Sequence, residues 1–194
     1  MRYLTCSLLA EGDSDLAFLG RLLHRQLEEI ASGSGRFYFD QIVSSPCRTI
    51  HSKDRVLASV TEDLGCYDLV LAHNDHNESG KLDQLREKLC VPSDSRLIGL
   101  VPVRETEAWM LVDLDALRSL GGGVDVSGLS ANPGDVERIK DPKAVLNQAL
   151  GKRASDDVFE FLGLHVSLTR LAQVPAYQTF LHDLTTALKE LNFP

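Results

Sequence analysis

The sequence predicts an α/β protein, with a parallel sheet of about four strands flanked by helices and a helical C-terminal extension. Three observations predict this fold: short apolar runs alternate with amphipathic segments, most of those runs lack a polar face, and several end in acidic residues. The chain has 194 residues, of which 43% are hydrophobic, enough for one compact core. We expect an α/β core over residues 1–122 and a mainly helical extension, packed on it, over residues 123–194.

The predicted strands are apolar runs that turn polar at their ends. They cover residues 3–10, 36–43, 67–72 and 96–103. The second is rich in aromatic and β-branched residues, whereas the first and third have the continuous apolar character of strands buried on both faces. Because parallel strands need crossover connections, we expect helices between them.

Apolar residues at spacings of three and four predict the helices. The first helix follows Asp13 or Ser14 as its cap, ends near residues 32–35, and carries the stripe Leu16, Leu19, Leu23, Leu27 and Ile30. Further helices are expected at about 52–64, around residues 82–89 and at 108–120. In the extension, residues 121–134 are typical of a loop, Pro142 suits a first helical position, and 161–172 and 177–191 carry apolar stripes.

Composition and charge narrow the classes of function. The chain carries 28 acidic and 20 basic residues, a net charge of -8, and shows no basic stripe of the kind that grips nucleic acid alone. Either the substrate is not nucleic acid, or metal ions and a partner supply positive charge. The sequence has no apolar run of membrane-spanning length, no secretory signal pattern and only scattered cysteines, so we expect a cytoplasmic protein without membrane contact.

Acidic side chains follow three of the predicted strands. Glu11 follows the first, Asp75 the third, and Glu105 and Glu107 the fourth. Carboxyl ends of parallel strands meet at one edge of a sheet, where ligands bind in this architecture. Carboxylates are hard ligands suited to Mg²⁺ or Mn²⁺, with Ca²⁺ as an inactive substitute. The pattern therefore predicts a metal site, although each residue taken alone is more simply a helix cap or a solvated side chain.

Two motifs carry a resemblance to a known domain. Residues 10–15 (Ala-Glu-Gly-Asp-Ser-Asp) resemble the first TOPRIM motif, and Asp75-His76-Asn77 is similar to its Asp-x-Asp motif with one carboxylate replaced by an amide. Over most of the chain the sequence resembles a prokaryotic TOPRIM-like family of unknown function, related to the OLD (overcoming lysogenisation defect) nucleases. Members share Glu-Gly-x-Thr-Glu near the start and Glu-Ala-Trp after the fourth strand, matched here by residues 11–15 and 107–109.

The resemblance implies a metal-dependent nuclease, encoded beside an ATPase partner in a defence-type system such as phage defence. By position, it implies that Glu11 acts as general base or metal ligand and that Asp75 and Glu107 share the catalytic centre. The acidic pattern and the resemblance together predict the metal ligands Glu11, Asp15, Asp75, Asn77, Glu105 and Glu107, of which Glu105 comes from the acidic pattern alone. The basic residues that could contact substrate phosphates are Arg104, Lys143, Lys152 and Arg153.

Several alternatives stay open. His73 and His76 flank Asp75, so a His/Asp transition-metal site or an acid–base histidine is conceivable. The acidic balance and Asn77 favour a second function, a catalytically degenerate TOPRIM scaffold that acts as a regulatory or interaction subunit. A third is an enzyme of small phosphorylated metabolites, which would need a closed pocket. A homodimer is compatible with each of them.

Overall fold

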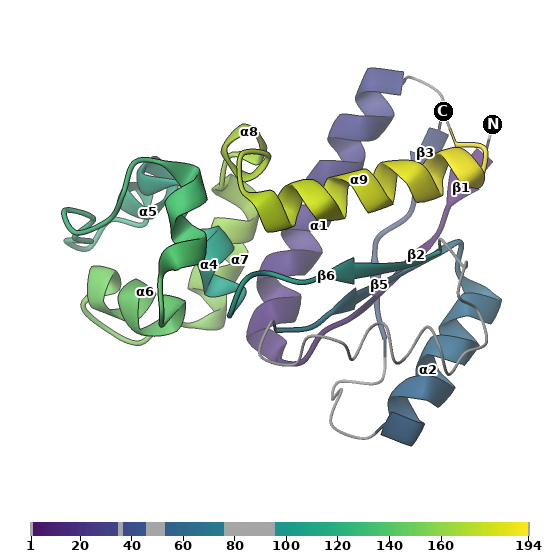
Figure 1. Cartoon of the computed structure of the whole chain (residues 1–194), viewed down its shortest axis with the longest axis horizontal. Coiled ribbons are helices and arrows are strands. Elements are labelled where there is room, and N and C mark those ends of the chain that lie inside the picture. Colours follow the sequence, from purple (N-terminus) through teal and green to yellow (C-terminus); the bar gives the residue numbers. More distant parts are fainter. Residues whose placement is uncertain (1, 35–36, 46–52, 76–95, 194) are drawn as a thin grey trace.

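The computed structural model describes residues 2–34, 37–45, 53–75 and 96–193 (Figure 1). The strands are β1 (Arg2–Leu4), β2 (Cys6–Leu9), β3 (Phe37–Phe39), β4 (Val43–Ser44), β5 (Leu69–His73) and β6 (Leu97–Leu100). The first helices are α1 (Asp13–Ser34), α2 (Lys53–Cys66), α4 (Glu107–Met110) and α5 (Leu114–Ser119). The C-terminal segment contains the 3₁₀ helix η2 (Pro133–Arg138), α6 (Pro142–Leu150), α7 (Asp156–His165), α8 (Leu168–Leu171) and α9 (Pro175–Glu190).

A four-stranded sheet organises the fold. Its order is β4-β2-β5-β6 and every pairing is parallel, which confirms the predicted mixed α/β architecture. In the register of its centre, Leu8 of β2 lies opposite Leu71 of β5, which lies opposite Ile98 of β6. The strands β1 and β3 form a separate parallel pair.

Both faces of this sheet are covered by helices. Leu8, Leu71 and Ile98 face a large apolar cluster that contains residues of α1 and α9. Leu9 and Val70 face a smaller cluster with Val56, Val60 and Leu64 of α2. Because neighbouring residues of β2 and β5 are buried on opposite faces, these strands have no polar alternation, as their sequences predict.

Several predicted elements are divided in the structure. The first strand forms β1 and β2, and the predicted strand over 36–43 forms the short strands β3 and β4, with residues 40–42 outside both. The predicted helix over 108–120 is wrong as one element, because it is interrupted at residues 111–113 between α4 and α5. Asp113 causes the restart: its Oδ1 accepts the backbone N–H groups of Asp115 and Ala116, as an N-cap does. The predicted helix around residues 82–89 lies outside the described residues.

The C-terminal segment packs around the carboxyl ends of the strands. Figure 1 shows α6 and α7 beside α4, beyond the end of β6, while α9 runs back along the sheet. Buried residues of this segment, such as Leu146, Phe159 and Tyr177, belong to the same apolar cluster as those of α1 and β2. Pro142 occupies the start of α6 after the N-cap Asp141, as predicted. In the described part of the chain, helices are too short or too polar to cross a lipid bilayer.

Candidate functional site

The carboxyl ends of β2, β5 and β6 bring acidic residues to one edge of the sheet. Glu11 comes two residues after β2, Asp75 two residues after β5, and Glu105 and Glu107 after β6. Asp15 joins them from the first turn of α1, where its Oδ2 accepts the backbone N–H of Gly12 at 3.1 Å. The parallel order of the strands therefore places the predicted carboxylates on one side of the molecule.

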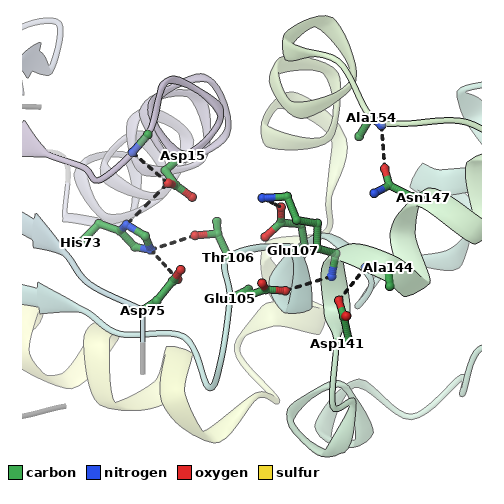
Figure 2. Close-up of polar contacts among 12 residues, drawn as sticks. Asp15, His73, Asp75, Glu105, Thr106, Glu107, Asp141, Ala144, Asn147 and Ala154 are labelled. Carbon is green, nitrogen blue, oxygen red and sulfur yellow. Dashed lines mark hydrogen bonds and ion pairs between the residues drawn. The ribbon is translucent and has the colours of Figure 1, made fainter. Parts of the chain in front are cut away.

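A buried histidine lies at the centre of one group of these carboxylates. His73, the last residue of β5, is fully buried, and its Nε2 lies 2.8 Å from Thr106 Oγ1 and 3.4 Å from Asp75 Oδ1. Its Nδ1 lies 4.0 Å from Asp15 Oδ2 (Figure 2). We call His73, Asp15, Asp75 and Thr106 the His73 site. It joins α1, the end of β5 and the segment after β6.

The charge of these neighbours controls the ionisation of His73. Burial acts to lower the pKa of the imidazole, because it disfavours the charged form. The contact with Asp75 and the negative charges of Asp15, Asp75 and Glu11 act in the opposite direction and outweigh burial, so the pKa of His73 is raised. Glu11 is therefore within electrostatic reach of the same imidazole.

A second polar group lies next to the His73 site. Glu107, the first residue of α4, is buried, and its Oε1 lies 3.4 Å from Lys143 Nζ of α6. Glu105 accepts the backbone N–H of Lys143 through Oε2 at 3.1 Å, so its carboxylate supports the first turn of α6 (Figure 2). The two glutamates that follow β6 thus contact Lys143, whereas Thr106 between them contacts His73.

Burial is the largest influence on the ionisation of Glu107 beside Lys143. It raises the pKa of Glu107, and the charges of Glu105 and Asp15 add to this effect, while a backbone hydrogen bond and Lys143 oppose it. The charge of Glu107 raises the pKa of Lys143 in turn. Since Asp15 acts on both Glu107 and His73, the two groups are electrostatically connected.

A cavity of about 310 Å³ adjoins Glu107. Lys143 and Arg153, both predicted phosphate contacts, line it together with Glu107, Asp13 and Ser14 at the start of α1. It lies where α1, α4, α6 and α7 meet. The cavity therefore places two basic side chains beside acidic ones, Asp156 among them, at the edge of the carboxylate region.

The remaining predicted site residues differ in their positions. Arg104 precedes the two glutamates in a left-handed backbone conformation with φ 74°, which is strained for a non-glycine residue and frequent at functional sites. Its buried Nε makes no hydrogen bond to the described residues. Lys152 is exposed in the turn between α6 and α7 and does not line the cavity. Asn77 and His76 lie outside the described residues.

The fit of a divalent ion depends on the donor chemistry and on the arrangement of the donors. Carboxylate oxygens from Glu11, Asp15 and Asp75 are suitable ligands for a hard dication. Within the described ranges, however, His, Cys, Asp and Glu side chains form no group of three arranged to hold a metal ion. The donor atoms are thus of the right chemical type, but as placed they do not form a metal site, and the side chains would have to close around an ion.

Sequence reasoning did not single out Thr106. It stands between Glu105 and Glu107, and its hydrogen bond to His73 spans 33 positions of the chain. No local pattern marks it, because Thr106 has an αR backbone at the N-cap of α4, where the side-chain alternation of a strand does not apply.

Comparisons with known proteins identify no relative. No protein-family model matches the chain, and no curated protein or solved structure is significantly similar to it.

Proposed function

We propose that the protein carries out divalent-metal-dependent phosphodiester chemistry of the nuclease type on nucleic acid, using a TOPRIM-like scaffold. The observation that carries this proposal is the arrangement of Asp15 and Asp75 around the buried His73, with Glu11 in electrostatic reach, at the carboxyl edge of a parallel sheet. Clustered carboxylates repel one another, and a divalent ion relieves this repulsion. Catalytic sites for such ions contain clustered carboxylates of this kind.

The proposal assigns a role to three carboxylates and two basic side chains of the described residues. Glu11, Asp15 and Asp75 would hold the ion, which when bound would stabilise negative charge developing on the phosphodiester. Glu11 is also the proposed general base. Lys143 and Arg153 face the adjacent cavity, where they would contact phosphate oxygens of the substrate.

A partner belongs to the proposal. The net charge of -8 opposes binding of a polyanion by the isolated chain, so an ATPase subunit is proposed to supply the main contacts to nucleic acid. The proposed setting is a cytoplasmic defence-type system. Mg²⁺ or Mn²⁺ is the proposed cofactor.

A regulatory subunit on a catalytically degenerate scaffold is the second candidate. Two observations favour it: the Glu107 carboxylate is already paired with Lys143, and the Glu105 carboxylate is bound to the start of α6. Neither carboxylate is then available to an ion without losing its present contact.

The 310 Å³ cavity favours a third candidate, an enzyme that acts on a small phosphorylated substrate, since the volume of the cavity lies at the lower end of small-molecule sites, roughly 300–1,000 Å³.

Cleavage assays with a matched control test the proposal. Supercoiled plasmid, linear DNA, RNA and p-nitrophenyl phosphate are incubated with the protein and Mg²⁺ or Mn²⁺, using wild type, Glu11→Gln and Glu190→Gln. Glu190 is exposed at the end of α9 and serves as the control for loss of one carboxylate. We expect cleavage of nucleic acid by wild type and Glu190→Gln, and its loss in Glu11→Gln.

The other outcomes separate the candidates. Hydrolysis of p-nitrophenyl phosphate alone would favour a small phosphorylated substrate. Absence of all cleavage would be followed by calorimetric titration with Mn²⁺. Binding that Glu11→Gln weakens would point to a missing partner, whereas absence of binding by the wild type would contradict the nuclease and favour the regulatory subunit.

A further inference from the structure

The imidazole of His73 carries a buried nitrogen that contacts with the described residues do not satisfy. His73 is fully buried, and its Nδ1 makes no hydrogen bond to any described residue. Asp15 Oδ2 lies 4.0 Å from this nitrogen, beyond hydrogen-bond distance. Buried polar atoms normally have a partner, so a nitrogen of this kind indicates a bound water or ion.

The other ring nitrogen determines which atom carries the proton. Nε2 lies 2.8 Å from the hydroxyl of Thr106 and 3.4 Å from the carboxylate of Asp75. An ionised carboxylate only accepts hydrogen bonds, so an Nε2–H group is favourable beside it, whereas an Nε2 lone pair would face negative charge. In the neutral imidazole this assignment leaves the lone pair on Nδ1, on the side of Asp15, where it faces a carboxylate and is favourable only with a proton or a cation between the two atoms (Figure 2).

This arrangement matches the usual environment of a metal-binding histidine. Such histidines donate their second ring N–H to a carboxylate or another oxygen, which fixes the orientation of the ring. Metal–ligand distances are about 2.0–2.2 Å, so adjacent donors of one ion lie roughly 3 to 3.6 Å apart. The separation of 4.0 Å between Nδ1 and Asp15 Oδ2 is slightly longer, so the Asp15 side chain has to move closer to share an ion with His73.

We propose that His73 is a metal ligand through Nδ1, together with Asp15 and Glu11, and that the site selects a first-row transition dication over Mg²⁺. This inference rests on the proposed metal-dependent function and specifies its ion. Imidazole nitrogen is a poor ligand for Mg²⁺ and a good one for transition metals, so a mixed nitrogen–oxygen set discriminates between them. In this more specific assignment Asp75 holds the ring together with Thr106 and no longer binds the ion itself, and the Asp15 and Glu11 side chains close on the ion.

Pulsed EPR of bound Mn²⁺ tests the proposal directly. Mn²⁺ is added to the full chain, and nuclear modulation is recorded with unlabelled protein and with protein labelled with ¹⁵N only at histidine. With unlabelled protein we expect ¹⁴N modulation from imidazole. With the labelled protein we expect ¹⁵N modulation in its place. The same result is expected for a variant that keeps His73 and carries glutamine at the other five of the six histidines.

A matched pair of single substitutions measures the contribution to affinity. In His73→Gln the amide can occupy the position of Nε2, beside Thr106 and Asp75, but no nitrogen replaces Nδ1. We expect its Mn²⁺ affinity by calorimetry to fall at least about tenfold, with loss of the histidine modulation. His182→Gln, at an exposed position of α9, should retain both.

Each result decides a different claim. Two results would overturn the role of His73 and leave the proposed function standing. One is saturable Mn²⁺ binding without histidine modulation, and the other is modulation that persists in a folded His73→Gln variant. Absence of saturable Mn²⁺ binding by the wild type overturns both. If His73→Gln does not fold, the variant that retains only His73 decides the question, because absence of modulation there contradicts the proposal.

Discussion

Gly163 of α7 lies against the backbone of Phe18 of α1, so closely that a Cβ atom at position 163 would overlap the Phe18 carbonyl oxygen. It would also lie 2.9 Å from Arg21 Cβ. Around this contact Arg25 donates to the carbonyl oxygens of Gly163 and Val166, at 2.9 Å each. The close crossing joins the helix that carries Asp15 to the C-terminal segment, which supports one wall of the cavity beside Glu107.

Gly163→Ala should therefore destabilise the protein. The added methyl group must displace backbone, which costs about 1–3 kcal/mol, and this exceeds the helix-propensity gain of up to about 1 kcal/mol. Urea denaturation of wild type and variant measures the difference. Gly20→Ala is the matched control within α1, because a Cβ there meets no atom within 4 Å; we expect unchanged or increased stability. Equal stability of the two variants would contradict the close crossing.

Asp113 connects the start of α5 to the segment before α8. Its Oδ1 accepts from the backbone of Asp115 and Ala116, and its Oδ2 accepts the Ser167 N–H at 2.9 Å. Asp113→Ala removes a cap and leaves the Ser167 N–H without this acceptor, so we expect a loss of about 1–3 kcal/mol in the free energy of unfolding. Thermal and urea denaturation give the measurement.

Asp115→Ala is the control for that loss. The Asp115 side chain is 89% exposed and, among the described residues, pairs only with Arg118 three residues along the helix. Surface substitutions of this kind change stability by about 0.5 kcal/mol or less. Similar effects of the two substitutions would show that the Asp113 contacts contribute no more than an ordinary surface charge.

Thr106 offers a test of the His73 site that does not require activity. Thr106→Val keeps the shape of the side chain but removes the hydroxyl that contacts His73 Nε2. Because both side chains are buried, we expect a loss of about 1–3 kcal/mol, measured by urea denaturation. Thr106→Ser, which retains a hydroxyl, should be more stable than Thr106→Val. The reverse order would argue against the hydrogen bond.

Local patterns predict much of this fold and part of the site. Apolar runs without alternation identify β2 and β5, because the residues of each strand are buried on both faces. The position of the acidic residues after β2, β5 and β6 at one edge of the sheet follows from the parallel topology alone. These features depend on neighbouring residues, which the sequence displays directly.

Contacts between distant residues account for what the sequence does not predict. The helix over 108–120 is interrupted at Asp113, which caps α5 locally and also binds Ser167, 54 positions away; no proline or glycine marks the site. Glu105 has the residue type and position of a metal ligand, yet its carboxylate binds the backbone of Lys143, 38 positions away. Only the tertiary structure determines which of several carboxylates faces His73 and which faces α6.

Cys6 in β2 should differ sharply in reactivity from the exposed Cys66 at the end of α2. Burial, with a smaller contribution from the negative charge of Asp68, raises the pKa of Cys6 from 9.0 to about 12. The thiolate is the reactive form, so iodoacetamide at about pH 9 should modify Cys66 and spare Cys6 in the folded protein. Peptide mass spectrometry before and after unfolding in urea measures both sites.

The same raised pKa predicts a dependence of stability on pH. Between pH 9 and 12 the folded state keeps the Cys6 proton while the unfolded state loses it, so the unfolded state binds fewer protons. Stability then falls as pH rises through this interval, and the contribution is fully present only below pH 9. Cys6→Ala removes the titrating group, so its free energy of unfolding should fall less steeply with pH than that of the wild type. Parallel slopes, or early modification of Cys6, would mean that this thiol is accessible in the native sheet.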